Sequence, residues 1–95
     1  MKLSKGNVSV RLKGHVLKEV AGYDFTYEGL SFNVHKDVNS PSNWKVTEPR
    51  TGLSVTWSTT RKGALERFEN VFQSRGKEAF ESVIAKNIEM LESYK

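Results

Sequence analysis

The sequence predicts an α+β fold in which an antiparallel sheet of four to six strands is covered on one face by two C-terminal helices. Two hairpin patterns, over residues 23–36 and 44–58, are followed by apolar residues at helical spacing after residue 60. An apolar sheet face needs a cover, and the amphipathic helices that follow can supply it. A chain of 95 residues fits a single domain, 1–95, built around one core.

The first hairpin turns at Glu28-Gly29, and apolar residues alternate with polar ones on either side of this turn. The expected facing pairs are Tyr27 with Leu30, Phe25 with Phe32, and Tyr23 with Val34. A slip by one residue would exchange the two faces of the ladder, so the apolar pattern specifies the register.

The second hairpin turns over residues 49–52, after a strand that begins at Trp44. The expected facing pairs are Glu48 with Leu53, Val46 with Val55, and Trp44 with Trp57. With these registers, every strand aromatic that can be placed points toward the helices, and the opposite sheet face is left to water.

The N-terminal stretch alternates as a strand, with valines at 8 and 10 and a leucine at 12 on one face. Gly14 permits a turn, and residues 16–20 can return as a second strand. A three-residue turn would pair Leu12 with Val16 and residue 8 with residue 20, but it would set Lys18 inward, so this register stays open. Residues 21–22 are expected to break the chain, and residues 37–43 form a loop rich in turn-favouring residues.

Two helices are expected at the C-terminus. Thr59 or Thr60 can cap the first helix, because a threonine hydroxyl accepts a bond from an unpaired amide of the first turn. The first helix ends at Arg75-Gly76, where the glycine can adopt the left-handed conformation. The second helix runs from about residue 77 to 94, and its apolar stripe is wider than one sheet face needs.

Charge and composition favour certain partners and argue against disulfide bonds and a membrane span. The net charge is +4, and residues 1–22 hold five cationic side chains against one carboxylate, which favours polyanionic partners or acidic proteins. The chain has no cysteine, which fits a reducing compartment, and no apolar run long enough to span a membrane. We expect a cytoplasmic protein without a membrane partner.

No pattern of catalytic residues is visible. The two histidines, His15 at a turn and His35 at a strand end, belong to no spaced pair or triad that would place a nucleophile or a metal. The acidic residues likewise show neither the spacing of a metal-binding loop nor the paired carboxylates of a glycosidase. We therefore expect no enzyme activity, no metal, no cofactor and no small-molecule substrate.

Basic side chains are the candidates for binding nucleic acid through its phosphate backbone. Arg61 and Lys62 begin the first helix, where free amides and the helix dipole attract anions. The alternative is a solvated first turn in which Lys62 pairs with Glu66. The candidate nucleic-acid-binding residues, on the polar sheet face and at this helix start, are Arg11, Lys13, Lys45, Arg61 and Lys62.

A partner protein is the alternative to nucleic acid. With all rings turned inward, the sheet offers no exposed aromatic on which bases could stack, which leaves electrostatic contact alone. The wide stripe of the second helix, with Asn87 near its centre, could instead pack against another protein or a second copy of the chain. We therefore expect a non-enzymatic binding module. In the alternative interpretation, this module is an inhibitor or an assembly factor that acts through the C-terminal helix or a sheet edge.

One stretch resembles small accessory proteins of bacteriophages and mobile elements. The stretch combines a Trp-x-Val strand at Trp44, a Thr-Gly turn at Thr51-Gly52, a second strand and a threonine-capped helix with an early alanine at Ala64. The match covers about a third of the chain, and Gly63 replaces the usual acidic residue before the alanine. The resemblance implies a phage-derived protein that binds host or phage macromolecules, and it assigns no site residue.

Overall fold

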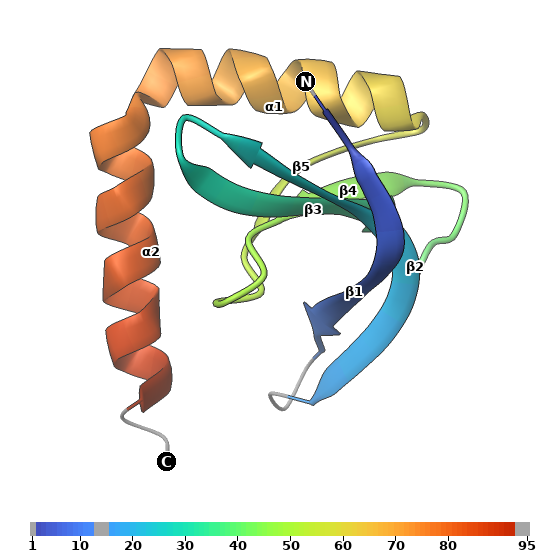
Figure 1. Ribbon diagram of the computed structural model, residues 1–95, viewed down its shortest axis with the longest axis horizontal. Coiled ribbons are helices and arrows are strands. Elements are labelled where there is room, and N and C mark those ends of the chain that lie inside the picture. Colours follow the sequence, from blue (N-terminus) through green and yellow to red (C-terminus); the bar gives the residue numbers. More distant parts are fainter. Residues whose placement is uncertain (1, 13–15, 93–95) are drawn as a thin grey trace.

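The computed structural model describes residues 2–12 and 16–92 and shows one antiparallel sheet followed by two helices (Figure 1). Neighbouring strands follow chain order, β1-β2-β3-β4-β5, so every connection in the sheet is a hairpin-type link. The elements are β1 (Ser4–Arg11), β2 (Leu17–Tyr27), β3 (Leu30–Lys36), β4 (Trp44–Thr47), β5 (Ser54–Ser58), α1 (Arg61–Arg75) and α2 (Lys77–Glu92). This architecture confirms the predicted α+β fold with the helices packed on the sheet.

The β2–β3 hairpin has the predicted register at all three facing pairs. Glu28 and Gly29 both have positive φ, 53° and 79°, as the two central residues of a type I′ turn require. This turn matches the right-handed twist of the strands, and the apolar alternation then keeps the ladder in register.

β1 and β2 pair in the register that a three-residue turn predicts. Val8 faces Val20, and the Leu12 amide donates to the Val16 carbonyl at 2.7 Å, while Gly14 lies outside the described residues. The expected break at residues 21–22 is wrong, because β2 continues through Gly22. A Cβ at Gly22 would lie 2.9 Å from both the Val34 carbonyl oxygen and Val8 Cγ2, so this glycine permits close packing instead of ending the strand.

The predicted β4–β5 register holds next to the turn, where the Glu48 amide donates to the Leu53 carbonyl at 2.9 Å, but it is wrong beyond that point. Trp44 faces Ser58 instead of Trp57, and Val46 faces Thr56, because a bulge interrupts the ladder between Val46 and Thr47. A bulge adds one residue to one strand and therefore reverses the faces beyond it. Trp57 consequently lies on the sheet face turned away from α1, with 52% of its surface exposed, contrary to the expectation that all strand aromatics point inward.

The main core lies between the sheet and α1, which crosses the sheet in Figure 1. The Phe68 ring packs edge-on against Phe25 and Phe32, with centroid distances of 5.4 and 4.7 Å. Such aromatic pairs add about 0.5–1.5 kcal/mol each beyond the burial of their area. The buried members of this core are Phe25, Phe32, Val34, Val46, Ala64, Phe68 and Phe72.

The ends of α1 are formed by the predicted residues. Thr60 has an extended backbone, and its hydroxyl accepts a bond from the Gly63 amide at 2.9 Å. Gly76 ends the helix with φ of 85°, and its amide donates to the Phe72 carbonyl at 2.7 Å. A Cβ at Gly63 would overlap the Ser58 hydroxyl, which explains why glycine occupies this first-turn position.

α2 turns away from α1 and packs on the fold mainly through its first half (Figure 1). The Phe80 ring stacks on Phe72 at a centroid distance of 4.7 Å, and Ile84 is the one buried residue of the helix. Val83 and Met90 remain about half exposed. Much of the predicted apolar stripe is therefore not covered by the described part of the chain.

The second face of the sheet is not left to water, which corrects our prediction. Asn33, His35 and Thr47 point to this face and are at most 6% exposed, and Val8 and Val10 are buried on the same side. β1 and β2 bend strongly in Figure 1, so the sheet is coiled and its polar face closes on itself.

Candidate nucleic-acid interface

Two aromatic rings lie side by side on the helix-facing side of the sheet. Tyr23 of β2 and Trp44 of β4 are both half-buried, and their ring centroids are 6.5 Å apart. β3 lies between them, with Val34 paired to Tyr23 in one ladder and Lys36 paired to Trp44 in the other. The sheet register therefore places a cation directly beside the tryptophan.

Two cations lie over these rings. The Arg61 guanidinium carbon is 4.6 Å from the centroid of Tyr23 and 6.0 Å from that of Trp44, and the Lys36 amine is 5.9 Å from Trp44. Cations within about 6 Å of an aromatic face are attracted by the ring quadrupole. These contacts orient both side chains while their charges remain at an exposed position.

A hollow of about 420 Å³ opens beside Trp44 and Tyr23. Three lysines line it, Lys5, Lys18 and Lys36, against a single carboxylate, Asp37, among its described lining residues. Together with Arg61, these lysines form what we call the ring-associated basic cluster: Lys5, Lys18, Lys36 and Arg61. The cluster combines positive charge and aromatic surface, as binding sites for nucleic-acid backbones do.

The predicted site residues do not form one site. Arg61 belongs to the ring-associated basic cluster, whereas Lys62 is exposed on α1 and, within the described chain, forms no ion pair with Glu66. Arg11 and Lys45 line a separate small cavity beside the buried His35, on the sheet face turned away from α1. Lys13 lies outside the described residues.

Sequence reasoning missed most of the ring-associated basic cluster. The alternation of β3 already indicates that Lys36 shares a face with Phe32 and Val34. What could not be predicted is the pairing of β3 with β4, because a seven-residue loop separates these strands and its turn at residues 40–43 does not specify their register. This pairing brings Trp44 to Lys36 and, with it, to Arg61.

A second exposed aromatic lies at the edge strand β5. The Arg67 guanidinium lies 5.5 Å from the centroid of Trp57 and donates to the Trp57 carbonyl at 3.0 Å. The hollow beside Tyr23 does not include this pair, and no lysine lies over Trp57 within the described chain. Trp57 therefore offers an internal comparison for Trp44.

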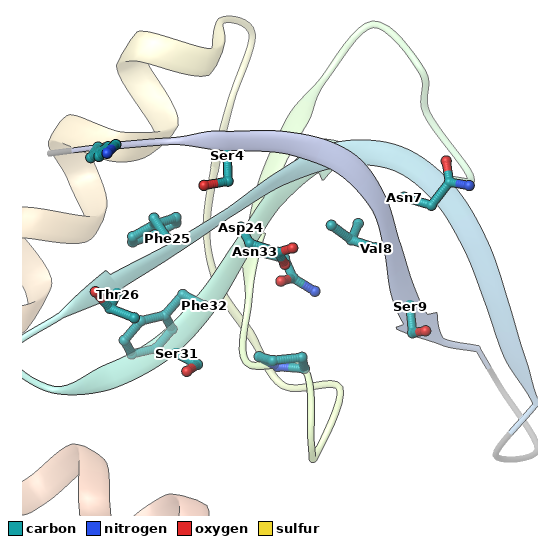
Figure 2. A pocket seen from close by; sticks show the side chains of 12 residues that line it. Ser4, Asn7, Val8, Ser9, Asp24, Phe25, Thr26, Ser31, Phe32 and Asn33 are labelled. Carbon is teal, nitrogen blue, oxygen red and sulfur yellow. The ribbon is translucent and has the colours of Figure 1, made fainter.

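Figure 2 shows a larger hollow of about 520 Å³ on the other face of the sheet. Asp24 and Asn33 lie side by side in it, and with the Asn33 amide oriented to satisfy both groups its nitrogen donates to Asp24 Oδ1 at 2.6 Å. Ser4, Thr26 and Ser31 add hydroxyl groups to its lining. Lys2 and Asp24 are its two charged lining residues in the described part of the chain, so the hollow has no excess positive charge to favour a phosphate.

His35 is a structural residue in this arrangement. Its Nδ1 lies 2.8 Å from the Lys36 carbonyl, which can only accept, so Nδ1 carries the proton and Nε2 accepts from the Thr47 hydroxyl at 3.3 Å. Burial lowers the pKa of His35 below 6.5, outweighing the Lys36 carbonyl, which raises it. Both ring nitrogens are therefore hydrogen-bonded within the fold.

Neither a metal centre nor a membrane span is found in residues 2–12 and 16–92. No group of three His, Asp or Glu side chains converges there as metal ligands would. Neither α1 nor α2 has the length and apolar content to cross a bilayer.

No protein-family model matches the chain, and searches of curated proteins and of solved structures likewise returned no match.

Proposed function

We propose that this chain is a non-enzymatic binding module that contacts the phosphate backbone of nucleic acid through the ring-associated basic cluster. The observation that carries the proposal is the placement of Lys36 and Arg61 over the rings of Tyr23 and Trp44, beside a hollow that Lys5 and Lys18 also line. Phosphate contacts by lysine and arginine supply most of the affinity in non-specific nucleic-acid binding.

The rings support this function by orienting the cations. Arg61 and Lys36 lose part of their side-chain freedom in the unbound protein, so less entropy is lost when a phosphate binds. The ring faces are already in contact with cations, which makes backbone contact the main interaction and base stacking on Trp44 secondary. The basic excess of residues 1–22 supports the approach of a polyanion to the side of the sheet on which Lys5 lies.

The experiment is a salt titration of binding to a fluorescein-labelled single strand and to a duplex, followed by fluorescence anisotropy. We expect the affinity to fall steeply with salt, and the double variant Lys36→Gln/Arg61→Gln to lower both the affinity and the slope. The slope should lose roughly 0.7 per lost contact on a single strand and roughly 0.9 on a duplex.

A matched control separates site-specific contact from net charge. Arg75→Gln/Lys86→Gln removes the same number of charges from exposed helix positions outside the hollow beside Trp44 and should leave the slope nearly unchanged. The proposal fails if the two double variants lose affinity equally, or if the wild-type protein binds neither nucleic acid at low salt.

α2 supports a second candidate function, that of a protein-interaction module. Ile84 alone is buried on this 16-residue helix, while Val83 is 48% exposed. Asn87, near the centre of the predicted stripe, donates to the Val83 carbonyl at 2.8 Å and is thereby satisfied within the helix. An apolar helix surface of this kind suits a partner protein or a second copy of the chain.

A further inference from the structure

A small cavity lies among the C-terminal ends of β1 and β3, strand β4 and the start of β5, with a volume of about 120 Å³. It is distinct from the hollow beside Trp44, although residues 37 and 38 border both. Its polar lining is made by Arg11, His35, Asp37, Asn39, Lys45, Thr47 and Ser54. Two cations and two hydroxyl groups therefore line this cavity.

Arg11 has an unused donor at this cavity. Its Nε is buried and has no hydrogen-bond partner among the described residues, while its terminal nitrogen donates to the Arg50 carbonyl at 3.4 Å. The stem of Arg11 packs against Gly52, where an added Cβ would collide with it. A guanidinium has five N–H donors, so the terminal nitrogens of Arg11, held by one long hydrogen bond to Arg50 among the described residues, keep donors for an acceptor in the cavity.

The second cation, Lys45, is only loosely paired. Its amine lies 3.8 Å from Asp37 Oδ2, and Oδ1 of the same carboxylate already accepts from the Asn39 amide at 3.0 Å. Arg11 and Lys45 together outweigh the single negative charge of Asp37, and His35 is neutral when buried in this hydrogen-bond arrangement. The lining thus has a net positive charge.

The cavity is large enough for a phosphate group. Each water occupies about 30 Å³ in the liquid, so the cavity holds the volume of about four waters. A tetrahedral phosphate group fits such a space. Guanidinium groups are well suited to phosphate, because their N–H donors match its oxygens.

We propose that this cavity binds one phosphate group, with Arg11 and Lys45 holding the charge and the hydroxyl of Ser54 completing the contacts. The group is either free inorganic phosphate or the terminal phosphate of a nucleic acid. The proposal does not depend on the ring-associated basic cluster, because it uses none of its four residues.

The test is an NMR titration with sodium phosphate at constant ionic strength, read at the backbone amides of Thr47, Gly52 and Ser54. We expect saturable shifts at these three amides. Arg11→Gln and Lys45→Gln should each weaken binding by about tenfold or more, as loss of a charge-assisted hydrogen bond implies. Asp37→Asn should tighten binding, because it removes the opposing charge.

Because the variants are expected to change the affinity in opposite directions, the test distinguishes loss of the site from misfolding. If Arg11→Gln lowers the melting temperature, Lys45→Gln and Asp37→Asn still decide the outcome, because a disrupted cavity could not bind more tightly. Lys86→Gln on α2 is the charge-matched control and should not change the affinity. Shifts that never saturate, or Lys45→Gln and Asp37→Asn changing the affinity in the same direction, would overturn the proposal.

A second titration identifies the source of the phosphate. A 5′-phosphorylated dinucleotide is compared with its 5′-hydroxyl counterpart at the same amides. Shifts with the phosphorylated form alone assign the cavity to a nucleic-acid end, and shifts with inorganic phosphate alone assign it to the free ion. Equal shifts with both dinucleotides and none with inorganic phosphate would contradict a phosphate-monoester site. Neither result affects the salt experiment on Lys36 and Arg61.

Discussion

At the residue scale, His35 couples folding to pH. Its side chain is 2% exposed, and burial lowers its pKa in the folded state below the value of 6.5 that it has in the unfolded chain. The unfolded state therefore takes up a proton first as the pH falls, and protonation favours unfolding. The stabilising effect of the neutral imidazole is complete above pH 6.5 and is lost progressively below it.

We expect the free energy of unfolding to decrease as the pH is lowered from 7 through 6.5 toward 5, in urea titrations followed by circular dichroism. His35→Gln should flatten this dependence, whatever its effect on stability at pH 7. Two charged groups that face the ring have opposing, smaller effects on the pKa of His35, which Lys45 lowers and Asp37 raises. An equally steep dependence in the variant would assign the pH response to other groups.

Alanine substitution is expected to have opposite effects on stability at two glycines that face each other across β1 and β2. Gly22 has no room for a Cβ, because the Val34 carbonyl oxygen and a Val8 methyl would both lie 2.9 Å away, whereas Gly6 has no atom within 4 Å of that position. Gly22→Ala should destabilise the fold by about 1–3 kcal/mol through overpacking. Gly6→Ala should be neutral or stabilising by up to about 1 kcal/mol.

Thermal melts of both variants provide the measurement. Similar losses of stability would mean that the packing of β1 on β3 across Gly22 is not as close as described. A loss restricted to Gly22→Ala would support the coiled sheet that buries Val8 and His35 on its second face.

At the scale of elements, prediction from sequence succeeded where a local signal specifies the geometry. The Glu28-Gly29 turn and the flanking alternation define the β2–β3 register, and Thr60 and Gly76 define the ends of α1. It failed at β4–β5, where the bulge at Val46/Thr47 leaves no mark on the apolar pattern. The turn there is built by Glu48, whose carboxylate accepts from the Arg50 and Thr51 amides, and the bulge follows outside this local network.

At the same scale, we expect α2 to be able to bind a second copy of the chain, because its packing on the rest of the chain is limited. If a second copy covers its exposed surface, light scattering should show a mass that rises with protein concentration. Val83→Asp should abolish that rise and leave the melting temperature nearly unchanged, since Val83 is 48% exposed. A strict monomer at every concentration would contradict self-association through α2.

At the scale of the whole molecule, the coiling of the sheet decides which predicted residues act together. The sequence predicted Arg11 and Lys45 on one open polar face, whereas in the coiled sheet both line a small cavity beside His35. Arg61 is directed to the other side, over Tyr23. Long-range pairing and coiling depend on contacts between hairpins, and no single segment of the sequence records them.

The central claim is that nucleic acid binds beside Trp44, and the two tryptophans make it directly testable. Their indole N–H signals are measured by NMR while a single-stranded oligonucleotide is added at low salt and again at high salt. We predict that the Trp44 signal shifts and saturates at low salt, that high salt suppresses this shift, and that the Trp57 signal barely moves. A shift confined to Trp57, or a Trp44 shift that does not respond to salt, would contradict the claim.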